Sequence, residues 1–249
     1  MTFSTPPAAP TMDRAATSPA QTARPGRLMI DAPVRAFHGL FALSFAGAWL
    51  TAESERWRDV HVTLGYAFGG LLLFRLVYGL IGPRQARLTL LWRRVSGLGD
   101  WLHHAKAGRV DLARAATLGM GAAMLLLMAV AAPLVLTGYA GYVEWLGMDD
   151  ALKEIHEFFA NSAMALVLAH LVLIALLSVL RRRNLATPML TGRTSGPGPD
   201  LVKANRGWLA MLVLVAYLGF VGWQTVHADL NGVATRQSDR HGGHHDDDD

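Results

Sequence analysis

The chain has 249 residues, of which 52% are hydrophobic and 17% charged, and its net charge at pH 7 is +4. Soluble domains carry about 25% charged residues, so this deficit indicates a membrane protein. Cysteine is absent, which excludes disulfides, zinc–thiolate sites, iron–sulfur clusters and covalent c-type haem attachment in this chain. Any metal chemistry must therefore use His, Met or carboxylate ligands.

The chain begins with residues 1–27, which are rich in Pro, Ala and Thr and lack a compact apolar core. We expect a disordered cytoplasmic arm without a cleavable signal peptide. Five apolar stretches follow, each near the ~17–25 residues that a helix needs to cross a hydrocarbon core of about 30 Å. The five predicted spans are Ala32 to Ala52, Val60 to Ile81, Ala115 to Tyr139, His156 to Leu180, and Trp208 to His227.

Two of these spans carry an irregularity. Arg35 and His38 interrupt the start of the first span, which makes it the weakest. Pro133 lies inside the third span, and proline in a membrane helix predicts a kink rather than an end. Arg75 lies inside the second span, where it would pair with an acidic ligand group or extend to the inner interface.

The Lys and Arg residues lie unevenly between the two sides of the membrane. The N-terminal arm and the second and fourth loops together hold 17 of the 23, whereas the other two loops and the tail hold five. By the positive-inside rule the basic side is cytoplasmic, so the N-terminus lies inside and, after five spans, the C-terminus outside. This distribution argues for a lipid bilayer rather than a nucleic-acid partner.

Two polar segments each leave two interpretations open. The second loop mixes aromatic and leucine side chains with basic ones, which fits either a helix on the inner membrane surface or a solvated basic loop. Its members include Trp92, Arg93, Arg94, Leu98, Trp101, Leu102 and Lys106. The tail, residues 228–249, has three His and four Asp near its end, which fits weak divalent-metal binding or a flexible terminus.

Four of the ten His lie within the predicted spans or at their entries, where an ionisable side chain is expensive and indicates a function. His61 and His156 are both at the outer side, whereas His38 follows the inner entry of the first span. His170 comes 14 residues after His156, which is about 21 Å along a helix and on the same face. These positions predict two facing pairs at two depths, His61 with His156 and His38 with His170, as two bis-imidazole haems require.

The inner pair fits less well, since His38 lies three residues after Arg35 and His170 eleven before Arg181. Helix tilt, or a fourth helix that extends into the cytoplasm, would have to absorb the difference. Gly65 and Gly69 follow His61 on its own helix face, where they either leave room for a flat macrocycle or allow close helix packing.

Three stretches of the sequence carry a family resemblance. They read PVRAFHGLFALSFAGAWLT from Pro33, WRDVHVTLGYAFGGLLLFRLVYGLIGPR from Trp57, and EIHEFFANSAMALVLAHLVLIALLSVLRRRNLATPMLTGR from Glu154. These stretches, with their motifs H-x3-GY and NL-x3-ML-TGR, resemble the bacterial cytochrome b561 family, which is related to the b-type cytochrome subunit of nickel–iron hydrogenases. The resemblance covers roughly Ile30 to Arg193.

The resemblance implies an all-α membrane protein in which a four-helix bundle holds two haem b groups. In the family the four matching His ligate the haem irons, which implies this role for His38, His61, His156 and His170. The expected domains are the arm (1–27), the di-haem domain (28–193), a linker with a fifth helix (194–227), and an extracytoplasmic tail (228–249). The segment RVDLARAATLGM before the third span lacks the family's His-Asn-Pro-like stretch, and the fifth span lies outside the resemblance.

The family also implies a function in the bacterial inner membrane. With two imidazoles on each iron there is no open site, so such a haem transfers electrons rather than binding oxygen. The expected partners are a quinone of the respiratory chain and, on the other side, a redox protein. The chain would act alone or as the membrane subunit of a larger oxidoreductase. No quinone-binding motif is evident.

Two other functions compete with this one. The first is a proton or metal transporter that uses intramembrane His, but it needs polar partners that the spans almost lack and an inverted repeat that is not evident. The second is a structural membrane anchor of a partner complex, in which the His would be incidental.

Overall fold

A computed structural model describes residues 26–108, 112–144, 148–194, 196 and 199–242. Nearly all of its secondary structure is helical, in agreement with the all-α prediction. Within the described chain, β structure is limited to one antiparallel pair of two-residue strands, β1 (Arg27–Leu28) and β2 (Arg193–Thr194). Most of the predicted arm, and the last seven residues of the predicted tail, lie outside the described residues.

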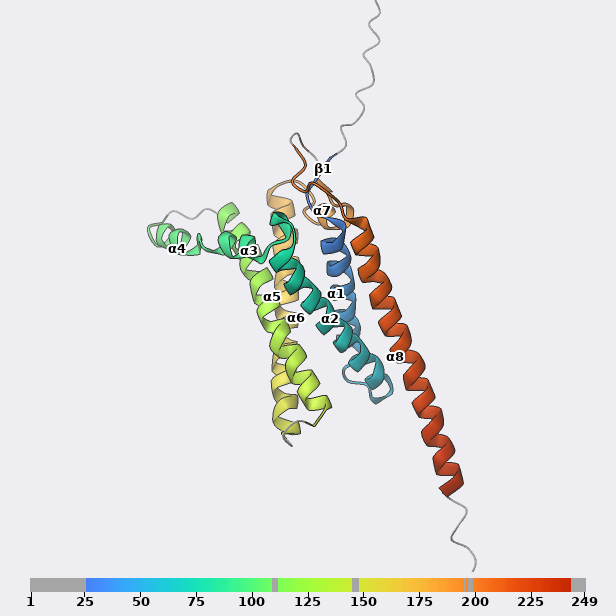
Figure 1. The fold of residues 1–249 in the computed structure, drawn as a ribbon. Helices are drawn as coiled ribbons and strands as arrows, with labels where there is room; N and C mark the ends of the chain where they lie inside the picture. The colour runs from blue at the N-terminus through green and yellow to red at the C-terminus, as the bar shows by residue number, and fades with distance from the viewer. Residues whose placement is uncertain (1–25, 109–111, 145–147, 195, 197–198, 243–249) are drawn as a thin grey trace, which may run out of the picture.

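Five long helices run side by side along one axis (Figure 1). They are α1 (Ala32–Thr51), α2 (Arg58–Ile81), α5 (Leu112–Tyr142), α6 (Asp149–Leu180) and α8 (Gly207–Gly242). Among the described residues, four segments are long and apolar enough to cross a membrane: Glu55–Ile81, Arg114–Tyr142, Asp150–Leu180 and Gly207–His227. The helix α1 is not among them, because Arg35 and His38 lower the mean hydropathy of a helix of only 20 residues.

The helix α6 begins at Asp149, seven residues before the predicted start of the fourth span at His156. The prediction followed the hydropathy boundary, but the polar residues from Asp149 onward continue the helix. Alanine, leucine, lysine and glutamate in this segment favour helix, and acidic side chains at an N-terminus interact well with the helix dipole. His156 therefore lies about two turns inside α6.

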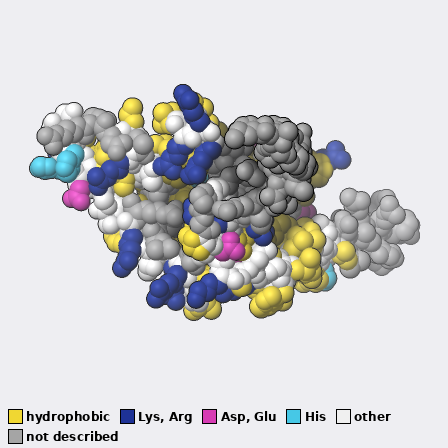
Figure 2. Space-filling model, turned by 90° about the horizontal axis from the view of Figure 1, so that it is seen from above, with side chains coloured by type: hydrophobic (Ala, Val, Ile, Leu, Met, Phe, Trp, Pro, Cys, Tyr) yellow, Lys and Arg dark blue, Asp and Glu magenta, His cyan; other side chains and the backbone are white. Residues whose placement is uncertain are grey.

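The connections divide between the two ends of the bundle. We call "basic end" the end at which α1, α5 and α8 begin and α2 and α6 finish, and "opposite end" the other. The basic end carries α3 (Leu88–Val95), α4 (Leu98–Lys106), α7 (Thr187–Thr191) and the strand pair. Lys and Arg side chains are spread over this end (Figure 2). Short 3-10 turns occur at Glu55–Trp57 and Arg84–Ala86.

The predicted basic loop forms the helices α3 and α4, which extend sideways from the basic end, across the direction of the bundle (Figure 1). The side chain of Trp92 on α3 is 71% exposed. Of the two interpretations that the sequence left open, an amphipathic helix on the membrane surface requires this orientation.

The long helices pack as two hairpins with α8 at the side. The helix α1 packs along α2, α5 packs along α6, and α2 joins the two hairpins through its contact with α5, while α8 lies against α1 and α2. A central core lies between the hairpins, and it is formed by Phe68, Leu72, Ala131, Leu134 and Ala163, with Phe41, Phe45 and Phe159 packed on it. Large apolar side chains on the outer faces, among them Phe158, Leu168 and Val215, are more than half exposed, as lipid-facing residues are in a membrane protein.

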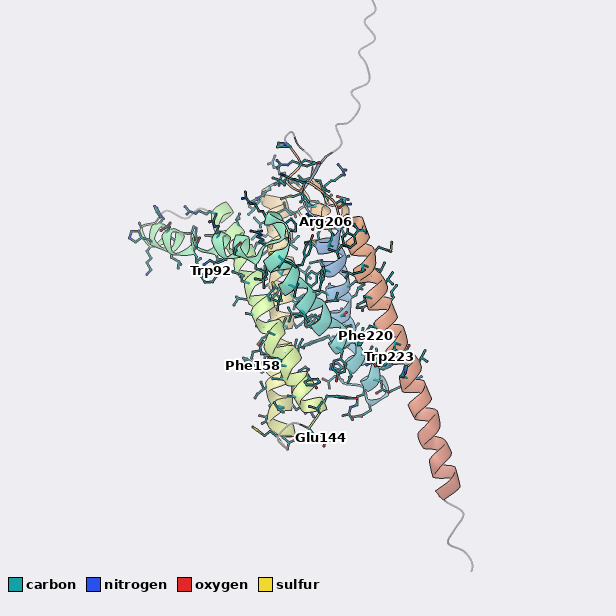
Figure 3. All side chains as sticks on the ribbon, in the orientation of Figure 1. Trp92, Glu144, Phe158, Arg206, Phe220 and Trp223 are labelled. Carbon is teal, nitrogen blue, oxygen red and sulfur yellow. The ribbon has the colours of Figure 1, made fainter. Side chains whose placement is uncertain are left out.

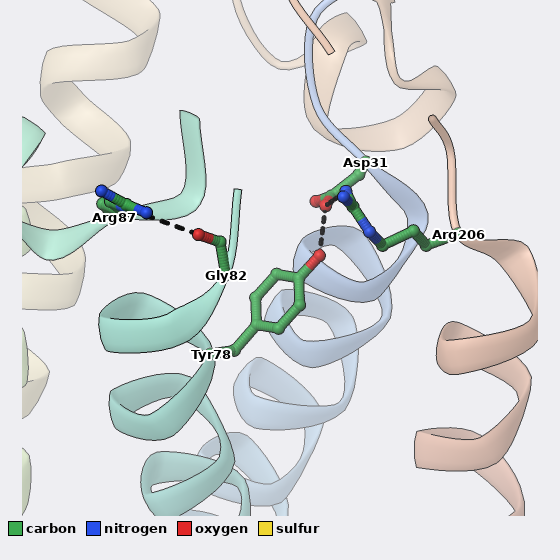
Figure 4. Close-up of polar contacts among 5 residues, drawn as sticks. All are labelled: Asp31, Tyr78, Gly82, Arg87 and Arg206. Atoms are coloured by element: carbon green, nitrogen blue, oxygen red, sulfur yellow. Dashed lines mark hydrogen bonds and ion pairs between the residues drawn. The ribbon is translucent and has the colours of Figure 1, made fainter. Parts of the chain in front are cut away.

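A buried acidic side chain joins three helices at the basic end. Asp31, at the start of α1, is 3% exposed and accepts a hydrogen bond of 2.5 Å from the Tyr78 hydroxyl on α2. The Arg206 guanidinium, just before α8, lies 3.7 Å from the same carboxylate oxygen (Figure 4). Nearby, the Ala32 amide donates to the Asn205 carbonyl. A buried carboxylate needs such partners, so this cluster fixes the relative positions of α1, α2 and α8.

Replacing Tyr78 by Phe should destabilise the bundle. Asp31 would lose its short hydrogen bond and keep only the longer contact with Arg206, so the free energy of unfolding should fall by about 1–2 kcal/mol. Unfolding in a denaturing detergent, followed by circular dichroism, measures this change. Tyr142→Phe is the matched control, since Tyr142 lies at the exposed end of α5. Equal stability of the two variants would contradict the assignment.

Candidate functional site

The four His identified in the sequence lie on the inner faces of three helices. His38 is six residues after the start of α1, and His61 is three residues after the start of α2. His156 and His170 both lie on α6, about 21 Å apart along its axis. All four side chains are partly buried.

His61 and His156 lie next to each other near the opposite end. Their ring centroids are 6.2 Å apart and their planes are inclined by 79°. A metal–imidazole nitrogen bond is about 2.0–2.1 Å long. Two rings that ligate one metal ion from opposite sides therefore have centroids about 6 Å apart, so this separation leaves room for one ion between them.

Both rings of this pair are oriented by a main-chain carbonyl. The His61 Nδ1 donates to the Ala48 carbonyl at 2.8 Å, and the His156 Nδ1 donates to the Leu134 carbonyl at 3.0 Å. Because a carbonyl can only accept, each ring carries its proton on Nδ1 and presents a lone pair on Nε2. Metal-ligating His residues characteristically have such a partner, which fixes both the tautomer and the ring orientation.

Each of these carbonyls is accessible for a local reason. Ala48 is one of the last four residues of α1, whose carbonyls have no amide partner in the next turn. Leu134 lies four residues before Gly138, and a Cβ atom at Gly138 would lie 2.8 Å from Cε1 and 3.0 Å from Nδ1 of His156. The absence of a side chain at Gly138 therefore allows the imidazole to reach the carbonyl of the preceding turn.

His38 and His170 both lie nearer the basic end, His38 six residues after the start of α1 and His170 ten residues before the end of α6. The Nδ1 atom of His170 is buried and has no hydrogen-bond partner among the described residues. A buried ring nitrogen without a partner is costly in a protein interior. This nitrogen is therefore available to bind a group that does not belong to the described chain.

The space between the helices that carry the pairs is consistent with a bulky group. In the described part of the chain no extensive close approach joins α6 to α1 or α2, although His residues of these helices face one another. A Cβ atom at Gly65 would meet nothing within 4 Å, whereas one at Gly69 would lie 2.8 Å from a methyl group of Val135. Of the two interpretations of these glycines, room for a macrocycle thus fits Gly65 and helix packing fits Gly69.

An apolar layer separates the two pairs. Ala163 lies seven residues from both His156 and His170, and it belongs to the central core. Phe41 and Phe68 stack in the same core, with ring centroids 3.9 Å apart. The middle of this apolar layer therefore lies about 10 Å along α6 from each of the two pairs.

Other candidate groups lie away from these pairs. The Arg75 guanidinium donates to the Ala86 carbonyl at 2.9 Å, towards the loop at the basic end. His103 and His104 lie on α4, outside the bundle. Within the described residues no group of three or more His, Asp or Glu is arranged to hold a metal ion. Two imidazoles alone are a poor metal site, but they suffice when a porphyrin supplies the other four nitrogens.

Comparison with known proteins agrees with this arrangement. A family model described as prokaryotic cytochrome b561 matches residues 30–192, well over half of the chain. The chain belongs to the prokaryotic cytochrome b561 family. It is accordingly a membrane b-type cytochrome with a role in electron transfer. No curated protein and no solved structure matches the chain.

The residues present fit the b-type haem of the family. The rings of His61 and His156, each with Nδ1 bonded to a main-chain carbonyl, have centroids 6.2 Å apart, and His170 has a buried Nδ1 atom without a partner in the described chain. The sequence pointed to the four His but missed the groups that orient them. Gly138 carried a usable signal, since it is a glycine five residues after the kink-forming Pro133 inside a span.

Proposed function

We propose that this chain is a di-haem cytochrome b that transfers electrons between the quinone pool and a redox partner, alone or as the membrane subunit of a larger oxidoreductase. His61 and His156 hold one haem, and His38 and His170 hold the other. The observation that carries the proposal is the pair of imidazoles at 6.2 Å, each oriented by a main-chain carbonyl. A bis-imidazole haem supplies one-electron redox chemistry without an open coordination site.

The protein's own residues supply orientation and exclusion of water. The carbonyls of Ala48 and Leu134 hold the two rings in the tautomer that ligates through Nε2. The stacked Phe41 and Phe68 keep water out of the layer between the two pairs. Because protons need water or polar groups to move, only electrons cross this layer. The two pairs lie at different depths, and electrons can therefore move from one side of the bilayer towards the other.

The proposal includes a topology with five spans. The helix α1 lies alongside α2 for its whole length, and it joins the bundle although its mean hydropathy is low. The excess of Lys and Arg at the basic end supports a cytoplasmic location for that end by the positive-inside rule. The N-terminus is then cytoplasmic, and the tail after α8 extracytoplasmic.

The haem content of wild type and four single variants tests the ligands. Wild type should contain two non-covalent b haems per chain, fully extractable by acid–acetone. Each His→Ala variant at the four positions should lose one, because the chain has no Cys to replace the ligand and an alanine methyl group cannot bind iron. Pyridine haemochrome quantification and redox titration would show which component disappears.

His61→Ala and His156→Ala should remove the same redox component, and their double variant should resemble either single variant, since the two residues act as a unit. His104→Ala in α4 is the control and should keep both haems. Loss of the same component in His61→Ala and His170→Ala would overturn the pairing, and a haem-free wild type would overturn the function.

Gly138→Ala should specifically weaken the haem held by His61 and His156. The new methyl group would force the His156 ring away from the Leu134 carbonyl, and loss of such an orienting bond typically lowers metal affinity by about 10–100-fold. Haem content during dilution in detergent measures the effect. Gly141→Ala is the matched control, because its Cβ would meet Leu152 at an ordinary 3.8 Å. Equal haem retention in both variants would contradict the role of Gly138.

A reporter fused after Asp249 should be extracytoplasmic. Five spans and a cytoplasmic basic end require this location. An alkaline phosphatase fusion should be active there and a fluorescent-protein fusion dark, with fusions in the loop between α4 and α5 as the reciprocal control. An active fluorescent protein after Asp249 would mean that one of the five helices does not cross.

A further inference from the structure

A cavity of about 630 Å³ lies between α2 and α8. Its lining is mostly apolar and aromatic, with Gly70 and Phe74 on α2 and Phe220 on α8 among its members. Phe220 lies on the side of α8 that faces the bundle, while Arg206 and Glu144 mark the basic and opposite ends (Figure 3). At this depth only a lipid-soluble molecule can occupy such a space.

Polar groups converge on the part of the cavity nearer the opposite end. Gln224 of α8 and Tyr66 of α2 both line it. No hydrogen bond joins the Gln224 amide or the Tyr66 hydroxyl to another residue in the described ranges, whereas the Tyr217 hydroxyl already pairs with Ser44 at 3.0 Å. Gln224 is partly buried and lies three residues before the end of the apolar segment Gly207–His227. A lipid acyl chain would leave it unpaired, but a ring that carries carbonyl or hydroxyl groups would satisfy it.

The cavity reaches a depth similar to that of the first His pair and depends on a helix that the family match does not include. Tyr66 follows His61 by five residues, about 7.5 Å along α2. The matched region ends at residue 192, before α8 begins. The cavity extends along α8 from Leu212 to Gln224, which is about 18 Å and suits a ring followed by part of an isoprenoid chain.

We propose that this cavity binds an isoprenoid quinone or quinol, with its ring at Tyr66 and Gln224 and its tail directed along Phe74 and Leu212. The proposal rests on the proposed function, since it gives the quinone a place beside the haem of His61 and His156. Each quinol oxidised there would release two electrons and two protons. The two electrons would pass one to each of the haems held by the two His pairs, and the two protons would leave to water at the opposite end.

Two substitutions test the cavity with matched controls. A Cβ atom at Gly70 meets nothing within 4 Å, so Gly70→Leu should fill the cavity without disturbing the helices. Gly219→Leu on the lipid-facing side of α8, where a Cβ is equally unobstructed, is its control. Gln224→Leu removes the amide and is compared with Thr225→Val.

The holoprotein in lipid nanodiscs would be given two probes. A photoreactive azido-ubiquinone should label α2 or α8, as mapped by mass spectrometry, and Gly70→Leu should abolish this labelling. Decylubiquinol should reduce the wild-type haems, and it should do so about tenfold more slowly or worse in Gly70→Leu and Gln224→Leu. Reduction by dithionite, the haem spectrum and both control variants should be unchanged.

The outcomes distinguish the two proposals. If decylubiquinol reduces the haems of Gly70→Leu as fast as those of the wild type, the cavity proposal is overturned and the electron-transfer function stands. Photolabelling of helices other than α2 and α8 would have the same meaning. The reverse result is also informative. If the cavity is labelled and Gly70→Leu abolishes this labelling, but decylubiquinol does not reduce the wild-type haems, the binding site is supported and the quinone-linked function is overturned.

Discussion

The arrangement of this bundle depends on how an imidazole is satisfied where there is no water. A neutral imidazole has one donor and one acceptor nitrogen, and both need partners in a membrane interior. The main chain is the nearest source of acceptors, but most helix carbonyls already pair with an amide of the next turn. The structure uses one carbonyl at the end of α1 and one that a glycine on α5 leaves open. With Nδ1 satisfied in this way, the Nε2 atom of each ring is left without a main-chain partner, and the two ring centroids lie 6.2 Å apart.

This requirement determines which helices can approach one another. His61 must reach the end of α1, so α1 and α2 form a close hairpin, and His156 must reach Leu134, so α5 and α6 form the other. The two hairpins then meet closely through α2 and α5, while α6 reaches α1 and α2 through side chains of the central core and through His156. Small residues hold membrane helices together by close packing, and Gly69 against Val135 does so here. The space that remains lies where the His pairs face each other.

The sequence predicted those features that depend on hydropathy and spacing alone. The ends predicted for the first, second and fourth spans lie within one residue of the ends of α1, α2 and α6, where polar residues or Gly82 and Pro83 follow the apolar run. The helices α5 and α8 continue past the predicted span ends, and α6 begins before the predicted span start, because helix propensity carries a helix beyond its apolar part and hydropathy does not record this. The positions of the His along their helices follow from the 3.6-residue period, since that period belongs to one helix at a time.

The remaining features require knowledge of which helix lies beside which. Gly65 and Gly69 are equivalent in the sequence, yet one faces open space and the other a valine of α5. Likewise, nothing in the run from Met29 to Pro33 distinguishes Asp31 as the buried partner of residues 47 and 175 positions away. Such pairings depend on how each helix is rotated about its own axis. A mostly apolar helix has no polar face that would indicate this rotation in its sequence.

The attachment of α8 shows how a helix outside the family match is held in a membrane. Burial of apolar side chains does not favour association here, since lipid covers them equally well. Two polar contacts hold α8 instead: Arg206 at Asp31 at the basic end, and the Tyr217 hydroxyl at the fully buried Ser44 of α1, about 16 Å further along. Between them, Val213 packs against Phe37 and Leu71.

Beyond Tyr217 no further polar contact joins α8 to the bundle in the described part of the chain. In this segment the amide of Gln224, which has no partner among the described residues, lines the cavity. The wall that α8 contributes to the cavity thus begins at Leu212, between the two contacts, and continues beyond the second one to Gln224.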